Sequence, residues 1–551
     1  MVRVLLCGLA FAALAGAQAT QSVSSVPSGA PVVDLGYAKY LGYVNETSEI
    51  TYYRGIQYAQ PPVGQLRWQK PRPIERQNPL GGAVFDATQI APSCYQSAPD
   101  SLILGGSLSG NFAAGEAQSE DCLILDVLVP NTPQSTRLPV MVQIHGGGYT
   151  LGNAQSYPGD AMVHASNGSL IYVSIQYRLG LFGFLGGSQI ADNGVLNAGL
   201  LDQRAALDWI QRNIRSFGGD PARVTIWGGS AGGGSVTFQL TASGANDEPP
   251  FSAAIAEYPW WQPMFNRSEQ DTLYRTALTL SNCSTLQCLR GLSSDVLGNL
   301  NQQVQNASYP GPGAGYGSFV FGPVVDGEFV RYLPGESFKR GQFYDVPLLV
   351  DHEAYEGDIF SNRTQTTQDA EVADAMNLFP YAGPSFFSRL YQLYPRSDYN
   401  STFFQRQTWF GDFIINCPTY TMASHAVDLN SNSSAVFKLT FAAGTELHGS
   451  TSVFLSNKDI DWAGANNRTL AEIMTSYWIS FARAYDPNIF KLSNAPAWPS
   501  YNSGGNGTVA NGESVGFTNL AVTYTTIGPA QDLDAGAKCD FFGNSELQVM
   551  N

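Results

Sequence analysis

Residues 223–233 read RVTIWGGSAGG, and this stretch decides the fold. Its first five residues are mostly β-branched or aromatic, which is typical of a buried strand. The next five, Gly228 to Gly232, form the pattern Gly-x-Ser-x-Gly, whose glycines let backbone segments pass closely around a strained turn. Because a segment compatible with a helix follows, the pattern predicts that Ser230 is a nucleophile held above the sheet edge. The alternative is a structural Gly-Ser turn.

Five further runs have the composition of strands buried on both faces. Each is short, nearly continuously apolar and bounded by turn residues, which favours a mostly parallel sheet. The runs are 138–144, 170–176, 252–256, 346–350 and 435–441. Between two of the strands, residues 199–215 place Leu207, Ile210 and Ile214 on one helical face. Strands that alternate with helices predict the α/β class, with a large, mostly parallel central sheet and helices on both faces.

A second glycine motif directly follows the run 138–144. It reads HGGG at 145–148. Such a loop turns its backbone N–H groups toward a carbonyl oxygen that becomes an oxyanion during acyl transfer. The N–H groups of Gly147 and Gly148, with that of Ala231 after the nucleophile, are therefore predicted to form an oxyanion hole. Taken without Ser230, the motif is an ordinary glycine-rich turn.

The general base is sought among five histidines: His145, His164, His352, His425 and His448. After a nucleophile on a strand–turn–helix motif, the acid and then the histidine follow in chain order. His145 and His164 precede Ser230, and His425 lies in a segment that looks helical. His448, in a glycine-containing loop after the run 435–441, is the predicted base.

The acid partner should follow a strand between Ser230 and the base. The segment after the run 346–350 carries four carboxylates: Asp351, Glu353, Glu356 and Asp358. Their positions do not distinguish among them, and three of the four are expected to be solvated loop charges.

Composition and the first residues bear on location. The chain has 551 residues and a net charge of −16, which disfavours nucleic-acid partners. Residues 1–19 read as a signal peptide, with Arg3, an apolar run from Val4 to Leu14 and small-residue cleavage sites. That run is shorter than the ~20 residues of a membrane span, so stable membrane insertion is not expected. The predicted mature chain is residues 20–551.

Cysteines and glycosylation sequons support secretion. Removal of Cys7 with the signal peptide leaves an even set of six cysteines, as expected in an oxidising compartment. Sequons for N-glycosylation begin at Asn45, Asn167, Asn266, Asn282, Asn306, Asn362, Asn400, Asn432, Asn467 and Asn506. We therefore expect a secreted, extracellular glycoprotein.

The motifs together resemble the type-B carboxylesterase/lipase family, which includes secreted fungal lipases and cholinesterases. The resemblance spans nearly the whole mature chain. Its most specific part runs from FGGDP at 217–221 through the strand into the serine motif at 228–233. Other matching segments are 54–68, 120–129, 321–329 and 477–488.

This resemblance implies an α/β-hydrolase fold formed by one domain over residues 20–551. It selects Glu356 as the acid, because the family places its glutamate directly before a glycine, and it supports His448 as the base. It also implies the disulfides Cys94–Cys122, Cys283–Cys288 and Cys417–Cys539; only the short Cys283–Cys288 loop is plausible from the residues alone. Two departures stand out. Gly229 replaces the family's usual glutamate before the serine, and the segment after His448 is shorter and less acidic than usual.

The implied activity is hydrolysis of small-molecule or lipid carboxylic esters through an acyl-enzyme, with no metal or organic cofactor. Lipase, sterol-esterase and feruloyl-esterase specificities stay open, as does the oligomeric state. A non-catalytic, cholinesterase-like binding protein is the alternative from another class, and a peptidase is a weaker one. The Cys94–Cys122 loop lacks the tryptophan of cholinesterases and carries Leu102, Ile103, Leu104 and Leu108, so it is either a lid or a surface loop. Tyr258-Pro259-Trp260-Trp261 either lines a substrate pocket or packs in the core.

Overall fold

The computed structural model describes residues 22–23, 25–76, 83–99, 117–429, 435–456, 467–501, 509–510, 513–514 and 516–551. Several predictions fall outside these ranges. They concern the signal peptide 1–19 with Cys7, the leucine-rich part of the Cys94–Cys122 loop and the sequons at Asn432 and Asn506.

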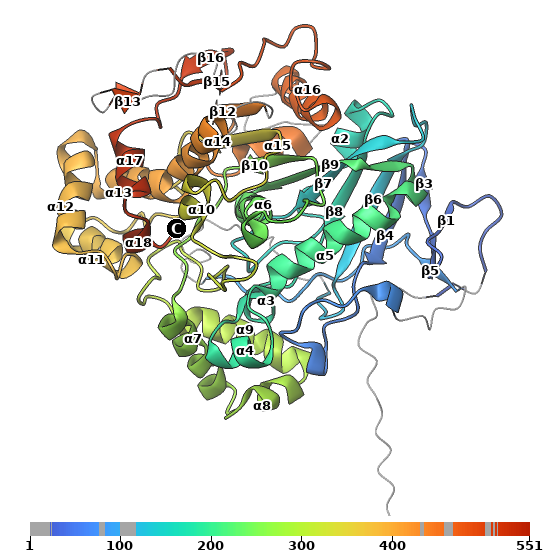
Figure 1. The fold of residues 1–551 in the computed structure, drawn as a ribbon, viewed down its shortest axis with the longest axis horizontal. Helices are drawn as coiled ribbons and strands as arrows, with labels where there is room; N and C mark the ends of the chain where they lie inside the picture. Colours follow the sequence, from blue (N-terminus) through green and yellow to red (C-terminus); the bar gives the residue numbers. More distant parts are fainter. Residues whose placement is uncertain are drawn as a thin grey trace, which may run out of the picture.

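The centre of the molecule is an eleven-stranded sheet (Figure 1). Seven adjacent strands, from β8 to β15, run parallel, and the strands at both edges are antiparallel. The spatial order is β16 (Ile527–Gln531), β15 (Thr518–Thr523), β12 (Val436–Ala442), β11 (Leu348–Glu353), β10 (Ala253–Glu257), β9 (Gly219–Gly229), β7 (Leu138–Ile144), β8 (Ile171–Ile175), β6 (Ile124–Pro130), β4 (Ile50–Gln57) and β3 (Tyr43–Asn45). A small sheet of β1 (Val32–Asp34), β2 (Lys39–Leu41) and β5 (Val84–Asp86) and a hairpin of β13 (Val509–Ala510) and β14 (Glu513–Ser514) complete the strands of the described residues.

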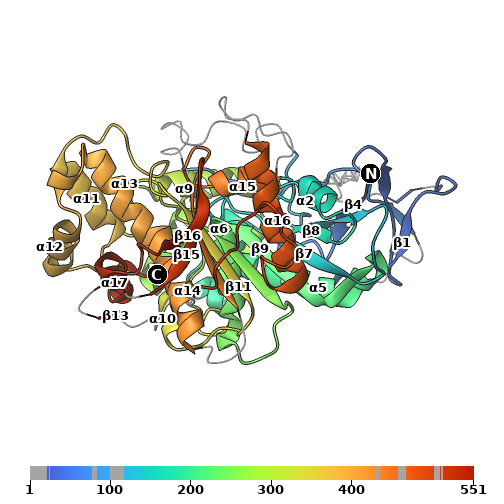
Figure 2. The same cartoon turned by 90° about the horizontal axis from the view of Figure 1, so that it is seen from above.

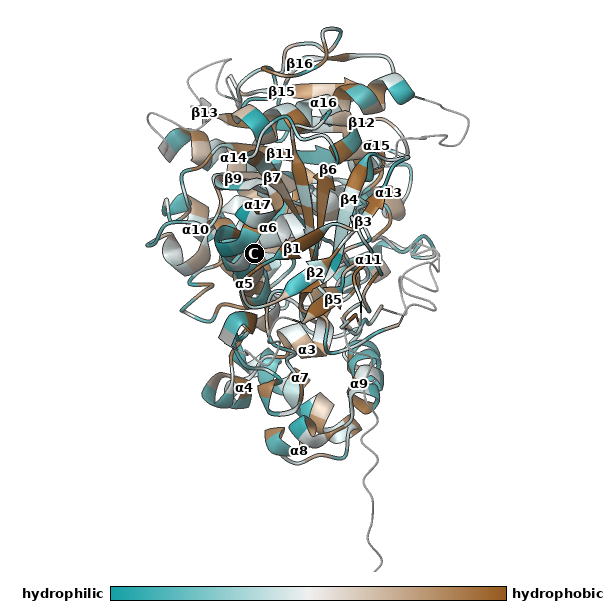
Figure 3. Ribbon diagram, turned by 90° about the vertical axis from the view of Figure 1, so that its right-hand side faces the viewer, coloured by the Kyte–Doolittle hydropathy of each residue, from teal (hydrophilic) through white to brown (hydrophobic). Residues whose placement is uncertain are grey.

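Helices cover both faces of this sheet, as Figure 2 shows from above. One face packs against α5 (Ala198–Asn213), α6 (Ala231–Leu240) and α14 (Cys417–Leu429), and the other against α2 (Asp160–Ala165), α15 (Ser450–Ser456) and α16 (Arg468–Ala484). Alternation along β7 divides its side chains between the two cores, since Val140 and Val142 lie in one and Met141 in the other. Hydrophobic colouring runs along the central strands in Figure 3. The predicted architecture is confirmed.

The six predicted strands and the predicted helix are all present, with shifted ends. The run 223–227 lies inside the longer strand β9, and the run 346–350 extends as β11 to Glu353. The helix predicted over 199–215 is α5, whose last predicted residues instead join a 3-10 helix, Ile214–Phe217. That helix ends at Gly218, whose φ of 86° terminates the helical path.

The remaining α-helices form two groups, one below the central sheet and one to its left in the view of Figure 1. One contains α3 (Gly180–Phe184), α4 (Ser188–Asn193), α7 (Arg267–Leu280), α8 (Leu286–Gly291) and α9 (Ser294–Ala307). The other contains α10 (Pro334–Lys339), α11 (Gln368–Leu378), α12 (Pro384–Leu393), α13 (Thr402–Gly411), α17 (Ala537–Gly543) and α18 (Glu546–Val549). Within the described ranges, no helix has the length and apolar character needed to cross a bilayer.

Three disulfides connect distant or neighbouring parts of the chain. They join Cys94 to Cys122, Cys283 to Cys288, and Cys417 to Cys539. These are the pairs that the family resemblance implies. The third fastens α17 to the start of α14, across 122 residues of sequence.

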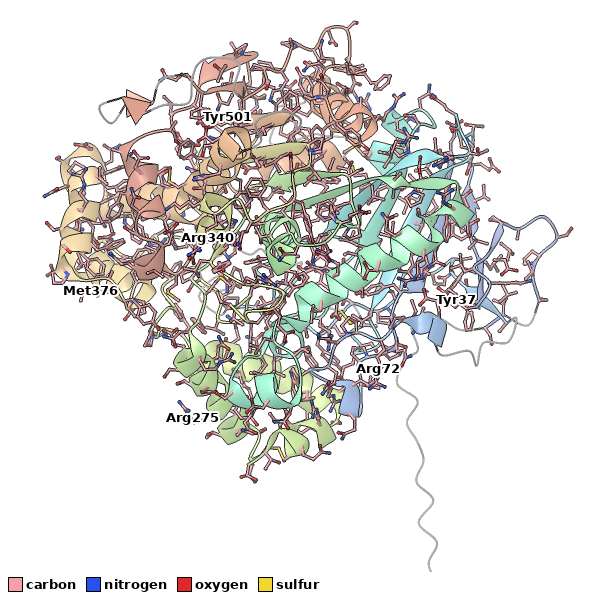
Figure 4. The ribbon with its side chains drawn as sticks, in the orientation of Figure 1. Tyr37, Arg72, Arg275, Arg340, Met376 and Tyr501 are labelled. Atoms are coloured by element: carbon pink, nitrogen blue, oxygen red, sulfur yellow. A yellow bond between two sulfur atoms is a disulfide. The ribbon has the colours of Figure 1, made fainter. Side chains whose placement is uncertain are left out.

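A buried cluster of charges ties β12 to the C-terminal segment. The ammonium group of Lys438 donates to both carboxylate oxygens of Asp532, each at 2.7 Å, and also to Asp534. His352 of β11 pairs with Asp534 through its Nε2 at 2.8 Å. The hydroxyl of Tyr501, labelled in Figure 4, donates to Asp532 at 2.5 Å.

Candidate active site

Ser230 lies on the turn between β9 and α6. Its backbone has φ 59° and ψ −127°, a strained conformation for a residue with a side chain. Two neighbours hold it there, since Ser230 N–H donates to the carbonyl of Glu257 at 3.1 Å and Trp260 N–H donates to the Ser230 carbonyl at 3.0 Å. A Cβ at Gly232 would overlap the carbonyl oxygen of Ile144, so the turn lies directly against the end of β7.

The loop 145–148 borders this turn. A Cβ built at Gly146 would lie 3.0 Å from the Cβ of Ser230. Gly147 and Gly148 have φ values of 103° and 61°, which favour glycine, and among the described residues their N–H groups donate no backbone hydrogen bond. Ala231 opens α6, where the first N–H groups of a helix have no intrahelical acceptor. Two of the predicted donors, Gly147 and Gly148, thus lie in the loop that borders the serine turn and donate no backbone hydrogen bond within the described residues.

His448 and Glu356 meet although 92 residues separate them. An isolated parallel bridge between Tyr355 and Leu447 aligns their two loops, and Tyr355 N–H donates to the Glu446 carbonyl at 3.0 Å. His448 Nδ1 lies 2.5 Å from the Oε2 of Glu356. The opposite ring nitrogen, Nε2, is buried without a hydrogen-bond partner among the described residues.

The other three carboxylates of this segment have different partners. The prediction that they are solvated loop charges is wrong, because Asp351 and Glu353 lie buried in β11 and the side chain of Asp358 is only 12% exposed. Asp351 Oδ1 accepts from the backbone N–H of Tyr258 at 2.9 Å, and Glu353 Oε1 accepts from that of Thr451 at 2.8 Å. Asp358 is ion-paired with Arg363. The structure therefore brings one of the four, Glu356, to a histidine.

The remaining histidines lie apart from this pair. His145 is stacked on Tyr177 behind the glycine loop, with ring centroids 4.4 Å apart, and His352 belongs to the Lys438 cluster. His425 is within α14, as its helical sequence predicts, and His164 is within α2.

Burial controls the electrostatics of the pair. It lowers the pKa of His448 to about 4. It raises the pKa of Glu356 above its ordinary value, against the hydrogen bond donated by Glu353 N–H at 2.7 Å. Glu353 is also buried, and burial together with the neighbouring Glu356 charge raises its pKa well above the ordinary value.

Aromatic side chains surround the imidazole. The ring centroids of Phe360 and Trp260 lie 5.0 and 6.1 Å from that of His448. Phe319 packs on Trp260 at 5.8 Å, and its ring occupies the space that a Cβ of Gly148 would take. Trp260 was singled out from the sequence; the place of Phe319 was not, because the loop before the matching segment 321–329 carries no motif.

Comparison with known proteins gives a consistent result. The family model described as "Carboxylesterase family" matches residues 29–516. Carboxylesterase patB of Penicillium expansum is 37% identical over 372 residues, which cover 59% of this chain and 65% of that protein. The chain thus aligns with slightly less than two thirds of patB.

Two further similarities extend over more of the chain. Lipase 1 of Geotrichum candidum is 30% identical over 510 residues, 82% of this chain and 86% of the lipase. The crystal structure of EstA from Aspergillus niger superimposes with a TM-score of 0.81 at 27% identity, covering 95% of this chain and 99% of EstA.

Proposed function

Because this chain belongs to the carboxylesterase family, we propose that it hydrolyses carboxylic esters with a Ser230–His448–Glu356 triad. Ser230 attacks the ester carbonyl while His448 Nε2 takes its proton. Glu356 holds the imidazole by its Nδ1–H and stabilises the imidazolium that forms. His448 then protonates the leaving alcohol, and water hydrolyses the acyl-enzyme by the same route.

The oxyanion is bound by the N–H groups of Gly147, Gly148 and Ala231. Each such donor is aimed at charge that develops only in the transition state, and losing one costs ~3–4 kcal/mol of transition-state stabilisation. The proposed cycle uses protein groups and water.

The observation that carries this proposal is the hydrogen bond between His448 and Glu356. It fixes the tautomer with the proton on Nδ1, which leaves Nε2 as the proton acceptor. That nitrogen has no hydrogen-bond partner among the described residues, Ser230 included, and Trp260 and Tyr258 contact both the imidazole and the serine turn. A non-catalytic binding protein would need neither a His448 protonated at Nδ1 nor glycine N–H groups, at Gly147 and Gly148, that are left without a backbone acceptor among the described residues.

The test compares matched histidine variants. Purified wild type, Ser230→Ala, His448→Ala and His425→Ala are assayed with p-nitrophenyl esters from acetate to palmitate and a hydroxycinnamate ester. We expect turnover by wild type and His425→Ala, and loss of about 10³-fold or more in the other two. A fluorophosphonate should label wild type at Ser230. Folded wild type that neither turns over an ester nor accepts the label would favour the binding-protein alternative.

For the acyl group, we propose a preference for short or planar acids. Phe319 closes over Gly148, and with Trp260 and Phe360 it forms an aromatic wall that is buried throughout. Phe319→Ala should shift the optimum of the chain-length profile toward longer acyl groups. Wild type most active on palmitate would contradict this preference and favour the lipase alternative.

We further propose that residues 1–19 direct secretion and that residues 20–551 form one mature, glycosylated catalytic domain. In support, none of the eight sequon asparagines in the described ranges is buried, and the six remaining cysteines are paired. Expression in a eukaryotic host should release protein into the culture medium. Its N-terminus should lie near residue 20, and treatment with an N-glycosidase should reduce its mass. Retention of the uncleaved chain in cells would contradict the proposal.

A further inference from the structure

The residue before the nucleophile has no room for a side chain. A Cβ built at Gly229 would lie 2.6 Å from Cε2 of Tyr258 and still closer to its Cζ and hydroxyl oxygen. The family resemblance leads one to expect a glutamate at this position. The tip of the Tyr258 ring takes its place, so a phenol rather than a carboxylate borders the serine turn.

Tyr258 is held in this place by its backbone. It directly follows β10, is fully buried and has a φ of 33°, which is rare for an aromatic residue. Its N–H donates both to the carbonyl oxygen of Asp351 at 2.8 Å and to the carboxylate Oδ1 of the same residue at 2.9 Å. A strained backbone of this kind persists only where its surroundings enforce it, and it is often found at functional sites.

The ring of Tyr258 also contacts the imidazole. The ring centroids of Tyr258 and His448 lie 5.0 Å apart at 75°, an edge-to-face arrangement. Phe360 makes a similar contact at 5.0 Å and 72°. Edge-to-face contacts restrict the orientation of both rings.

We propose that Tyr258 is a positioning residue: its ring orients the imidazole of His448, and its uncharged hydroxyl fills the side-chain space of residue 229. This inference rests on the proposed triad. Burial, with the charges of Glu257 and Glu353, raises the pKa of the Tyr258 phenol, which stays neutral. The charged or titratable groups that face His448 are then Glu356 and Glu353 from β11 and its loop and Tyr258 after β10, while Trp260 and Phe360 carry no charge.

The first experiment separates the ring from the hydroxyl. Tyr258→Ala should lower kcat about tenfold or more while KM changes less than about threefold, because acyl transfer rather than binding needs the oriented imidazole. Tyr258→Phe keeps the ring and should retain kcat within about threefold of wild type. The matched control is Tyr344→Ala, another buried tyrosine packed edge-to-face, on Phe251 at 5.9 Å. It should lose stability but not kcat. Equal kcat in Tyr258→Ala and wild type would overturn the inference.

The second experiment is a double-mutant cycle. Gly229→Ala should displace the ring and lower kcat, yet in a Tyr258→Ala background it should cost little more, because the colliding ring is gone. Additive losses would show that the two positions act independently and would contradict the proposal.

The third experiment restores a carboxylate. In the double variant Gly229→Glu, Tyr258→Gly, the glycine fits the left-handed φ at position 258 and removes the ring. The glutamate then places a negative charge beside His448. It should raise the pKa of His448 and move the acid limb of the kcat/KM profile to higher pH. An unmoved limb, in a variant that a fluorophosphonate labels, would contradict the inference that the side-chain space of residue 229, which Tyr258 fills, lies beside His448. Fluorophosphonate labelling distinguishes failure of the proposed triad from failure of the role of Tyr258. Wild type that is not labelled would refute the triad itself. Tyr258 variants that are labelled and keep the kcat of wild type would refute only the role of Tyr258.

Discussion

Ser230 adopts backbone angles that neither a strand nor a helix provides, and hydrogen bonds from two neighbouring segments keep it there. Such a conformation costs of order 1–3 kcal/mol. The cost is offset by packing in a turn whose flanking residues, Gly228 and Gly232, lie fully inside the protein. Under the proposed function, this strained turn directs the Ser230 side chain toward the substrate while its backbone is held by the two hydrogen bonds.

The acid of the triad can be tested with an isosteric change. Glu356→Gln keeps the size of the side chain but offers an amide to His448 Nδ1, which no longer favours one tautomer or stabilises the imidazolium. We expect kcat to fall on the order of 10³–10⁴-fold without loss of folding. Asp358→Asn, two residues away and ion-paired with Arg363, is the control and should stay within about twofold of wild type. Comparable losses in both variants would contradict the assignment.

The pH profile follows from the buried base. In the proposed mechanism unprotonated His448 accepts the proton of Ser230, so we expect activity to fall as pH drops through the pKa of His448. Because burial lowers that pKa to about 4, the acid limb of kcat/KM should lie well below the usual histidine value of ~6.5. Hydrolysis rates of a neutral ester between pH 3.5 and 8 measure it. A midpoint at or above 6.5 would be inconsistent with the desolvated imidazole.

The site residues differ in how far the sequence could predict them. Ser230 and the loop 145–148 follow from local motifs next to recognisable strands. Glu356 was open among four carboxylates until the family resemblance selected it, because the bridge between Tyr355 and Leu447 that aligns the two loops is a tertiary contact. No spacing rule predicts that the ring of Tyr258 occupies the side-chain space of Gly229. This contact depends on the relative positions of the ends of β9 and β10 in the folded sheet.

At the scale of elements, strand β11, which leads to Glu356, is anchored by the buried charge cluster of Lys438, Asp532 and Asp534. His352 follows Asp351 in β11 and points to the opposite face, where it pairs with Asp534, which is itself bound by Lys438. Strands β11 and β12 carry the acid and base loops at their ends. The charge cluster therefore stabilises the pair of strands on which the geometry of His448 and Glu356 depends.

This anchor predicts a stability that changes at alkaline pH. Asp534 raises the pKa of His352 to about 9, above the unfolded value of ~6.5, so the protonated imidazole stabilises the fold. The contribution, about 3 kcal/mol, is complete below about pH 6.5 and is lost as pH rises through about 9. The melting temperature of wild type should fall across this range, and that of His352→Gln should fall less. His164→Gln, an exposed histidine of α2, should behave as wild type; if all three melt alike at every pH, the anchor is absent.

Element prediction worked best where strands are buried on both faces. All six predicted strands belong to the parallel part of the sheet, where continuous apolar runs give a clear signal. The edge strands β3 and β16 were not predicted, because they are short and partly exposed. Strands β4 and β15 were not predicted either, because their segments mix polar with apolar residues. β6 was missed as a strand although its segment was recognised as a family motif.

At the scale of the whole molecule, the disulfides act on very different lengths of chain. In the unfolded state, the Cys417–Cys539 bond closes a loop of 122 residues and the Cys283–Cys288 bond one of 5. Paired Cys→Ser replacement at 417 and 539 should lower the free energy of unfolding by about 2–5 kcal/mol, since a long loop loses more entropy on closure. The same replacement at 283 and 288 should cost less. Denaturant unfolding measures both, and a larger loss for the short loop would contradict the entropic account.

The contact between Gly229 and Tyr258 also has a consequence for how such sequences diverge. Two positions that share one volume cannot drift independently: a lineage with a large residue at 229 must lose it before an aromatic ring is tolerated at 258, and the reverse path must pass through a small residue at both. The order of substitution is therefore constrained, and a mutational library built on this chain should recover side chains at 229 almost only in clones that have first lost Tyr258.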